Sequence, residues 1–204
     1  MINLVVALPA EAKPIIQHFD LEKANNPEPF QIYQNGNFSL IISGVGKMAA
    51  SFATAYLYVF LGKKPNQAWL NIGIAGHRRY SIGESFLAHQ MIDRETSRTW
   101  NLPLVSQSLC PSETVCTVEQ AEELYTESYL YDMEGSGFYA TARRFSIAEC
   151  IQCFKIVSDN PNFPCKKITA SMVEKLIRSK LDTIEAITNE LDEFISHQSK
   201  VVLR

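Results

Sequence analysis

Three carboxylates, Glu11, Glu134 and Asp159, each follow an apolar run that predicts a strand. In open α/β sheets, ligands bind outside the carboxyl ends of the strands. These acids come from distant parts of the chain and could therefore meet in one crevice. Each acid alone is more often a favourable negative charge at a helix N-terminus. The set is the stronger signal, because converging carboxylates are groups that act as general acids and bases.

The segment Gly44-Val45-Gly46-Lys47-Met48-Ala49 matches the glycine pattern GxGxxG/A between a predicted strand and a predicted helix. A dinucleotide site also needs an acidic residue about 20 positions later, at the end of the next strand. The next strand, Trp69–Gly73, offers none, and Gly46-Lys47 lacks the flanking residues of a P-loop. We expect no cofactor, and a tight glycine turn whose amides face a ligand.

The cysteines and histidines predict neither a metal site nor a redox site. Cys150 and Cys153 form a CxxC pair at the start of a predicted strand, whereas a thioredoxin-like pair stands at a helix N-terminus. No second ligand pair follows at zinc spacing, and the 4 histidines show no pattern such as HExxH. The cysteines number 5, an odd count that favours free thiols in a reducing cytoplasm.

Alternating strands and helices must position these groups. We expect strands at Ile2–Leu8, Phe30–Tyr33, Phe38–Ser43, Ala68–Ala75, Glu84–Ile92, Tyr129–Met133 and Ile151–Ser158. We expect helices at Glu11–Phe19, Lys47–Leu61, Val118–Glu127 and Gly137–Ile147, and a loop at Asp93–Thr114. A last helix is expected to begin at Ser171, because Ser171 and Glu174 fit a capping box. The alternation predicts one α/β domain over residues 1–204, with a central mixed, mostly parallel sheet flanked by helices.

Composition and charge exclude several classes of partner. The chain has 204 residues, 46% of them apolar, which is enough for one domain with its own core. A net charge of -3 gives no basic footprint for nucleic acid or for an anionic membrane. The most apolar stretch, Met48–Leu61, is shorter than the roughly 20 residues of a membrane span, and the N-terminus lacks a secretory signal pattern. We expect a cytoplasmic protein that binds a small molecule.

Five short segments carry a resemblance to a known superfamily. They are Ala7-Leu8-Pro9-Ala10-Glu11, Ser43-Gly44-Val45-Gly46-Lys47, Asn71-Ile72-Gly73-Ile74-Ala75-Gly76, Asp132-Met133-Glu134-Gly135 and Val157-Ser158-Asp159. In this order, and spread over nearly the whole chain, they resemble the purine nucleoside phosphorylase/uridine phosphorylase superfamily. Within it, the nearest branch is that of the methylthioadenosine/S-adenosylhomocysteine nucleosidases. The resemblance implies the fold of nucleoside phosphorylases.

The resemblance also implies hydrolysis of the N-glycosidic bond of a purine nucleoside, without a cofactor. Glu11 would be the base that activates water, and Asp159 the acid that supports protonation of purine N7, with Ser158 helping to position it. Glu134 would accept hydrogen bonds from the ribose hydroxyls, and Met133 would pack against the sugar. Carboxylates suit an oxocarbenium-like transition state, and the acid and the base need different environments.

The resemblance implies three further site residues. Gly44 and Gly76 belong to the glycine segments and are expected to bind substrate with them. Lys155 stands where the nucleosidases have an arginine near the attacking water. The family commonly forms homodimers whose partner contributes to the pocket, so we expect a homodimer.

Two alternatives stay open. The phosphorylases of this superfamily bind phosphate through arginines, whereas this sequence has Glu11 near the first loop and Lys47 in the second, which favours water as the nucleophile. The other alternative is a nucleoside-binding protein without turnover. Ile74, where the nucleosidases have serine, and Lys155 would fit such a loss.

Overall fold

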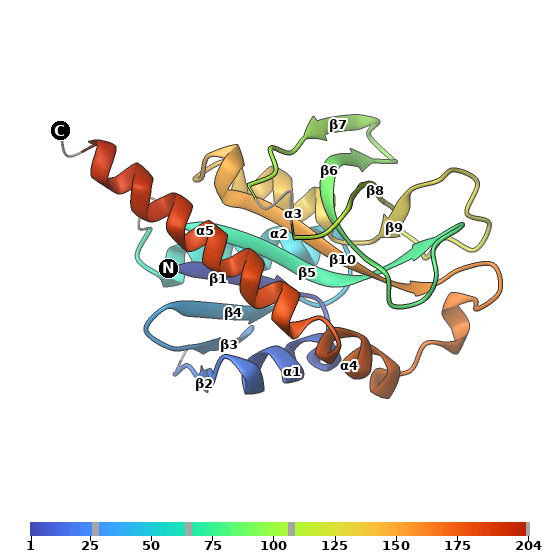
Figure 1. The fold of residues 1–204 in the computed structure, drawn as a ribbon, viewed down its shortest axis with the longest axis horizontal. Coiled ribbons are helices and arrows are strands. Elements are labelled where there is room, and N and C mark those ends of the chain that lie inside the picture. The colour runs from blue at the N-terminus through green and yellow to red at the C-terminus, as the bar shows by residue number, and fades with distance from the viewer. Residues whose placement is uncertain (26–28, 64–66, 106–108, 203–204) are drawn as a thin grey trace.

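The computed structural model describes residues 1–25, 29–63, 67–105 and 109–202. Its strands are β1 Ile2–Val6, β2 Glu22–Lys23, β3 Gln31–Gln34, β4 Phe38–Ile42, β5 Ala68–His77, β6 Ser85–Asp93, β7 Arg98–Asn101, β8 Ser112–Thr117, β9 Leu130–Asp132 and β10 Ile151–Asp159 (Figure 1). Its helices are α1 Pro9–His18, α2 Lys47–Phe60, α3 Gly135–Ala142, α4 Ala170–Arg178 and α5 Leu181–Val202, with short 3-10 turns at Ala148–Cys150 and Cys165–Lys167.

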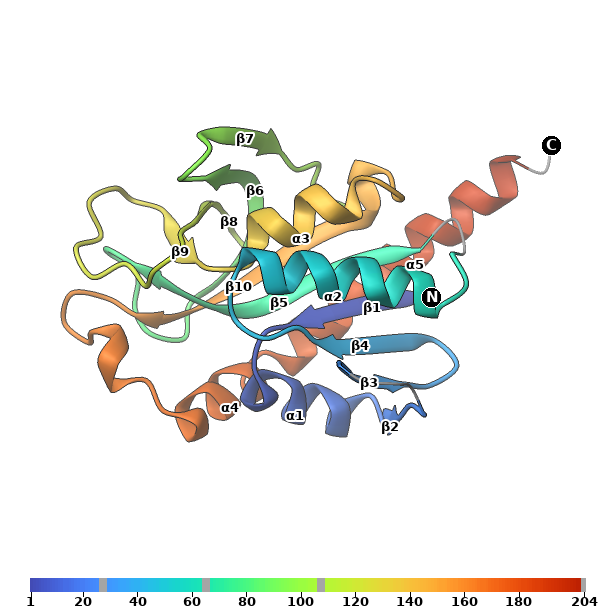
Figure 2. The same cartoon turned by 180° about the vertical axis from the view of Figure 1, so that it is seen from behind.

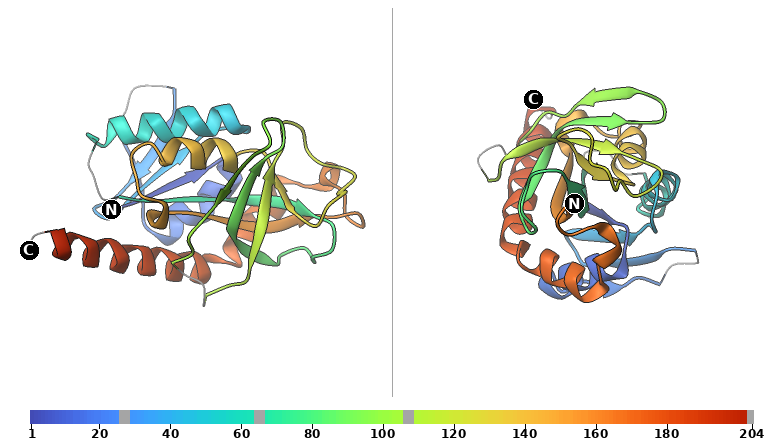
Figure 3. Two further views of the ribbon diagram at one scale, coloured as in Figure 1. Left: turned by 90° about the horizontal axis from the view of Figure 1, so that it is seen from above. Right: turned by 90° about the vertical axis from the view of Figure 1, so that its right-hand side faces the viewer.

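The strands form one mixed sheet with helices on both faces. Its order is β10-β6-β8-β9-β5-β1-β4-β3-β2, with β7 paired to β6 and β10 also paired to β5. Helices α2 and α3 lie side by side on one face, whereas α5 crosses the opposite face (Figures 2 and 3). The predicted α/β fold with a mixed sheet flanked by helices is confirmed.

Alternate residues of the central strands point to the two helical layers. Leu4 and Val6 of β1 pack in a core with α1, α4 and α5, whereas Val5 packs in a second core with α2 and α3. All five residues of β1 are buried, as the continuous apolar run Ile2–Val6 predicts for a strand covered on both faces. The fold therefore holds the ends of these strands rigidly.

One edge of the sheet collects the residues predicted to do chemistry. Strand β1 is parallel to β5, and β5 is parallel to β10, so their carboxyl ends lie together. Strand β9, which precedes Glu134, is antiparallel to β5 and pairs with the last two residues of β5, Gly76 and His77. Glu134 therefore reaches the same edge because β9 crosses the end of β5, and not because the two strands share a direction.

The helix predicted at Val118–Glu127 is wrong, because this segment is an irregular loop. The Glu122 side chain accepts hydrogen bonds from the backbone N–H groups of Leu124 and Tyr125. Such local bonds compete with the helical pattern. Tyr125 has a φ of 47°, which ends any right-handed helix at that point.

Two other predicted boundaries need correction. The stretch Asp93–Thr114, predicted as a loop, contains β7 and the start of β8, while residues 106–108 lie outside the described residues. Strand β7 was missed because it lies at the sheet margin and exposes most of its side chains, so it carries no apolar pattern. The helix predicted at Gly137–Ile147 begins and ends earlier, as α3.

The C-terminal helix is divided into α4 and α5, with the break at residues 179 and 180. The Thr169 hydroxyl, and not that of Ser171, caps α4 by accepting a hydrogen bond from the Met172 N–H. Ser171 lies inside the helix, so the predicted capping box with Glu174 does not form. Both helices follow the predicted apolar spacing, and Val173, Ile177 and Ile184 are buried in the core.

Two observations bear on membranes and thiols. Within the described residues, no helix combines the length and the apolar character needed to cross a membrane. All five cysteines are free thiols. Burial raises the pKa of Cys150 to about 11 and that of Cys153 to about 12, which disfavours the thiolate form that reacts.

Candidate active site

A pocket of about 630 Å³, its open mouth included, lies at this edge of the sheet. Its lining contains six of the predicted site residues: Glu11, Gly76, Met133, Glu134, Ser158 and Asp159. The other lining residues are Ala7, Leu8, Val45, Ile74, Ala75, Val118, Ala121, Glu122, Tyr131, Asp132, Cys165 and Ile168. The structure therefore brings the three carboxylates into one cavity.

Glu11 is fixed by three backbone amides. It lies in the first turn of α1, where Oε2 accepts hydrogen bonds from the N–H groups of Ala7 and Leu8, both at 2.9 Å. Oε1 accepts one from the N–H of Ile74 at 3.1 Å. Burial raises the pKa of Glu11 above its usual value, while the amide donors and the charge of Lys155 oppose the rise. The carboxylate is therefore held in one orientation and made more basic than an exposed one.

Gly73 shows how closely the sheet passes beneath this carboxylate. A Cβ atom added at Gly73 would lie 3.1 Å from Oε1 of Glu11 and 3.4 Å from Nζ of Lys155. These contacts are tighter than ordinary van der Waals separation. Glycine at this position therefore lets the strand, the carboxylate and the buried cation approach one another.

Lys155 does not line the pocket but forms a buried ion pair next to it. Its Nζ lies 2.7 Å from Oδ2 of Asp132, and the two side chains are 1% and 0% exposed. Asp132 also accepts hydrogen bonds from the Thr117 hydroxyl and the Gly135 N–H. Burial alone would lower the pKa of Lys155, but the carboxylates of Asp132 and Glu134 raise it above its ordinary value. Lys155 is therefore a permanent cation beside the acidic cluster.

Glu134 stands immediately before α3 and faces the glycine turn. Its Oε1 accepts a hydrogen bond from the Gly46 N–H at 2.8 Å. Burial, followed by the charge of Asp132, raises the pKa of Glu134 to about 7. Gly44 lies outside the lining, and its N–H donates to the Ala7 carbonyl. These two amides of the predicted glycine turn therefore face protein acceptors, and Val45 between them lines the pocket.

Asp159 is the last residue of β10, and a hydroxyl donates to each of its oxygens. The Ser158 hydroxyl donates to Oδ1, which is the positioning contact predicted for Ser158. The Tyr125 hydroxyl donates to Oδ2. The sequence did not single out Tyr125, because it lies in the loop mistaken for a helix and belongs to no motif. Asp159 thus has a different hydrogen-bonding environment from Glu11, whose partners are backbone amides.

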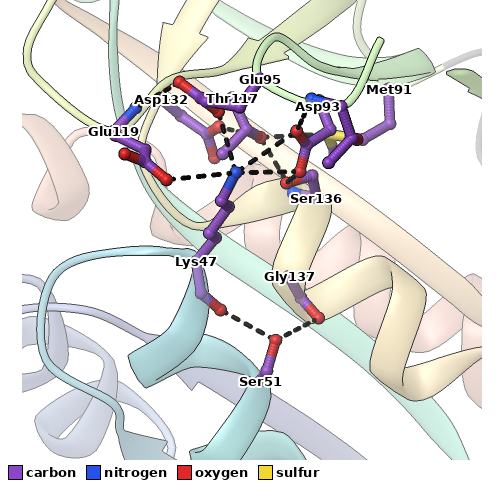
Figure 4. Close-up of polar contacts among 11 residues, drawn as sticks. Lys47, Ser51, Met91, Asp93, Glu95, Thr117, Glu119, Asp132, Ser136 and Gly137 are labelled. Carbon is purple, nitrogen blue, oxygen red and sulfur yellow. Dashed lines mark hydrogen bonds and ion pairs between the residues drawn. The ribbon is translucent and has the colours of Figure 1, made fainter. Parts of the chain in front are cut away.

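Lys47 at the start of α2 is enclosed by carboxylates outside the pocket (Figure 4). Its Nζ lies 2.8 Å from Glu95, 3.3 Å from Asp93 and 3.6 Å from Glu119. The Ser136 hydroxyl also donates to Asp93. The charge of Lys47 is therefore neutralised away from the cavity.

Every charged residue of the lining is an acid. The lining contains Glu11, Glu122, Asp132, Glu134 and Asp159, and the residues that form it include neither lysine nor arginine. Among the described residues, no group of three or more His, Cys, Asp or Glu side chains is arranged to hold a metal ion. The cavity can exchange protons and accept hydrogen bonds, but it offers no cation to an anionic ligand.

No family model and no curated protein matches this sequence. Solved structures do match. Futalosine hydrolase of Helicobacter pylori superposes with a TM-score of 0.73 at 15% identity, covering 93% of this chain and 97% of that chain. The 5'-methylthioadenosine/S-adenosylhomocysteine nucleosidase of the same organism gives 0.72 at 16% identity, with coverages of 93% and 97%.

A plant structure matches equally well. The 5'-methylthioadenosine nucleosidase of Arabidopsis thaliana gives a TM-score of 0.73 at 18% identity, covering 95% of each chain. Because the identities are low, these likenesses concern the fold, and at that level they confirm the resemblance carried by the sequence. This chain has the fold of these nucleosidases and of futalosine hydrolase.

Proposed function

We propose that the protein is a nucleosidase that hydrolyses the N-glycosidic bond of a purine nucleoside of the methylthioadenosine or adenosylhomocysteine type. The products are the free base and the ribose moiety. The observation that carries the proposal is the convergence of Glu11, Glu134 and Asp159 in one acidic pocket. The fold, which is that of two nucleosidases and a futalosine hydrolase, supports it.

Glu11 is the base in this proposal, and its hydrogen bonds identify the reacting atom. A carboxylate offers about four lone-pair sites, two on each oxygen. The amides of Ala7 and Leu8 fill both sites on Oε2, and that of Ile74 fills one on Oε1. The remaining site on Oε1 accepts a proton from the attacking water. Burial, which raises the pKa of Glu11, makes it a better proton acceptor near neutral pH.

Glu134 and Met133 bind the sugar in this proposal. Oε1 of Glu134 is occupied by the Gly46 amide, while no described residue provides a hydrogen bond to Oε2. Oε2 therefore accepts from the ribose hydroxyls, and Met133 packs against the ring. A negative Glu134 also stabilises the positive charge that develops on the ribosyl group. Asp159 acts at the opposite end of the substrate, on purine N7.

Water fits this pocket better than phosphate as the nucleophile. A phosphate ion brings negative charge, and phosphate sites commonly use arginine forks or lysine to bind it. Here the lining contains five carboxylates and neither lysine nor arginine, and Lys47 is already bound by three acids. A phosphate ion would find no free cation to bind it, because Lys155 is already paired with Asp132 and Arg94 with Glu122, so phosphate-dependent cleavage is disfavoured.

The alternative of binding without turnover depended on Ile74 and Lys155. At Ile74, the contact to Glu11 comes from the backbone N–H, so it does not depend on the side chain. At Lys155, the cation expected at this position is present and acts on both Glu11 and Glu134. Position 74 still supplies its amide to Glu11, and Lys155 still supplies a positive charge beside it, which favours an active enzyme.

We also propose that the enzyme is a homodimer formed through α2. This helix exposes Met48 by 67%, Phe52 by 62% and Val59 by 58% on one face. Contiguous apolar surface of this kind marks interaction sites. Val45, which precedes the helix, is 51% exposed and also lines the pocket, so a second copy seated on α2 would border the substrate.

The free thiols support a reducing compartment, such as the cytoplasm.

A direct test incubates the protein with methylthioadenosine, adenosylhomocysteine, inosine and adenosine, with and without phosphate, and separates the bases by chromatography. Release of base without phosphate is the expected result. Base and ribose 1-phosphate formed only when phosphate is present would show a phosphorylase. Measurable binding of these nucleosides without any release would show a binding protein.

A further inference from the structure

We propose that Tyr125 is a positioning residue for leaving-group protonation, acting through Asp159. This inference rests on the nucleosidase function proposed above and adds a residue that no sequence motif identifies. Its basis is a buried hydrogen bond, the packing around it and the way the loop holds it.

The Tyr125 hydroxyl donates directly to Oδ2 of Asp159, and the Tyr125 side chain is almost fully enclosed, at 1% exposure. The hydrogen bond between Tyr125 and Asp159 lies directly against Gly76, one of the predicted pocket residues. A Cβ at Gly76 would lie 2.5 Å from Oδ2 of Asp159 and 2.7 Å from Cε1 of Tyr125. Such distances are impossible for a real side chain, so glycine at position 76 is what lets the tyrosine and the carboxyl group meet.

The loop holds the tyrosine in a backbone conformation that bulky residues rarely adopt. Tyr125 has a φ of 47°, in the left-handed region. Glu122 maintains this conformation by accepting hydrogen bonds from the N–H groups of Leu124 and Tyr125. Arg94 in turn holds Glu122, with Nη1 2.7 Å from Oε2. Backbone outliers of this kind concentrate at functional sites, where the surrounding contacts sustain them.

The tyrosine remains a hydrogen-bond donor over the working pH range. Burial, with the neighbouring carboxylate of Asp159, raises the pKa of Tyr125 well above its ordinary value. With Ser158 donating to Oδ1 and Tyr125 to Oδ2, the Asp159 carboxyl group cannot rotate freely, and each oxygen keeps one lone-pair site. One of these sites carries the proton when Asp159 is in its acid form.

The two hydroxyls then act on the step in which the base leaves. Asp159 gives its proton to purine N7 while the bond from the ribose carbon to N9 breaks, and the bonding electrons go to the purine. Asp159 becomes a carboxylate, and the hydroxyls of Tyr125 and Ser158 stabilise the new negative charge. Hydrogen bonds to a charged group are stronger than those to a neutral one, so Tyr125 favours proton donation.

The test compares two leaving groups in the intact enzyme. Methylthioadenosine needs a proton on its base, whereas 4-nitrophenyl β-D-ribofuranoside releases a phenolate that needs none. We expect Tyr125→Phe to lower kcat on methylthioadenosine by about tenfold or more, the equivalent of one hydrogen bond to a charged group, with little change in KM. Cleavage of the nitrophenyl riboside should stay within about twofold of wild type. Tyr129→Phe, in the same loop but outside the pocket lining, is the matched control and should behave as wild type.

A double variant separates positioning from a general effect on the fold. If Tyr125 acts through Asp159, adding Tyr125→Phe to Asp159→Asn should slow methylthioadenosine hydrolysis no further than Asp159→Asn alone. Provided that the wild type is active, three results would each overturn this inference alone. The first is a Tyr125→Phe variant with unchanged activity, and the second is an equal loss of activity on both substrates. The third is a double variant whose loss is the sum of the losses of the two single variants. A wild type that releases base from no nucleoside would overturn the proposed function, and this inference with it.

Discussion

Replacing Lys155 with methionine tests the buried charges of the site. The variant keeps most of the volume of the side chain but leaves Asp132 fully buried without its cation, which lies 2.7 Å away in the native protein. Asp132 retains hydrogen bonds from Thr117 and Gly135, which soften the loss but do not supply positive charge. Breaking a buried ion pair by removing one partner costs about 3–5 kcal/mol. For a domain of this size, that lowers Tm by roughly 6–20 °C.

The assay is urea denaturation of the wild type, of Lys155→Met and of the double variant Lys155→Met/Asp132→Asn. The double variant removes both charges, so we expect it to recover at least half of the lost free energy of unfolding. A loss below about 1 kcal/mol in the single variant would refute the assignment of a strong buried pair. A double variant no more stable than the single one would show that the damage comes from packing and not from the unpaired carboxylate.

The same variant should also move the pH profile. Lys155 lowers the pKa of both Glu11 and Glu134 in the native protein. Without this cation both pKa values rise, so Glu11 becomes an ionised base only at higher pH. In any active preparation, the acid limb of kcat/KM should therefore shift to higher pH. An unchanged limb would mean that Lys155 does not act on the base.

Three further predictions follow from the site and from α2. Glu11→Gln should lower kcat by about 100-fold or more while preserving the circular dichroism spectrum, and wild-type turnover would exclude it as the base. Because the pKa of Glu134 is about 7, against an ordinary value of 4.5, the native state binds the extra proton, and wild-type stability falls as pH rises between those values. Glu134→Gln should therefore gain about 3 kcal/mol relative to wild type between pH 4.5 and pH 8 in urea titrations, and a difference independent of pH would contradict this. Met48→Glu combined with Phe52→Glu should give a monomer by analytical ultracentrifugation. The control is Ile147→Glu, at an apolar residue that is 49% exposed and lies outside α2, and it should leave a dimer. An intact dimer in the α2 variant would place the interface elsewhere.

The sequence predicted the residues that lie at the ends of buried strands. Glu11 and Asp159 follow or end continuous apolar runs, and such runs are visible in sequence because both faces of these strands are covered. The Ser158–Asp159 contact was also predictable, because the two residues are neighbours in the chain. Local pattern was therefore sufficient wherever the element or contact was itself local.

Contacts between distant segments could not be predicted in the same way. The ion pair of Lys155 with Asp132 and the bond from Tyr125 to Asp159 each join residues from different elements, and nothing local marks them. The edge strand β7 is too exposed to carry an apolar pattern. The loop at 118–129 has helix-forming residues, but Glu122 and its ion pair with Arg94 impose another conformation. Tertiary contacts overrode local propensity at these places.

The central claim is that these carboxylates direct water, and not phosphate, onto a purine nucleoside. The most direct measurement follows methylthioadenosine cleavage by ³¹P NMR and chromatography over a series of phosphate concentrations that begins at zero. We predict that the rate of base release is independent of phosphate and that inorganic phosphate remains the only phosphorus signal. A sugar 1-phosphate signal that grows with released base, with no release at zero phosphate, would contradict the claim.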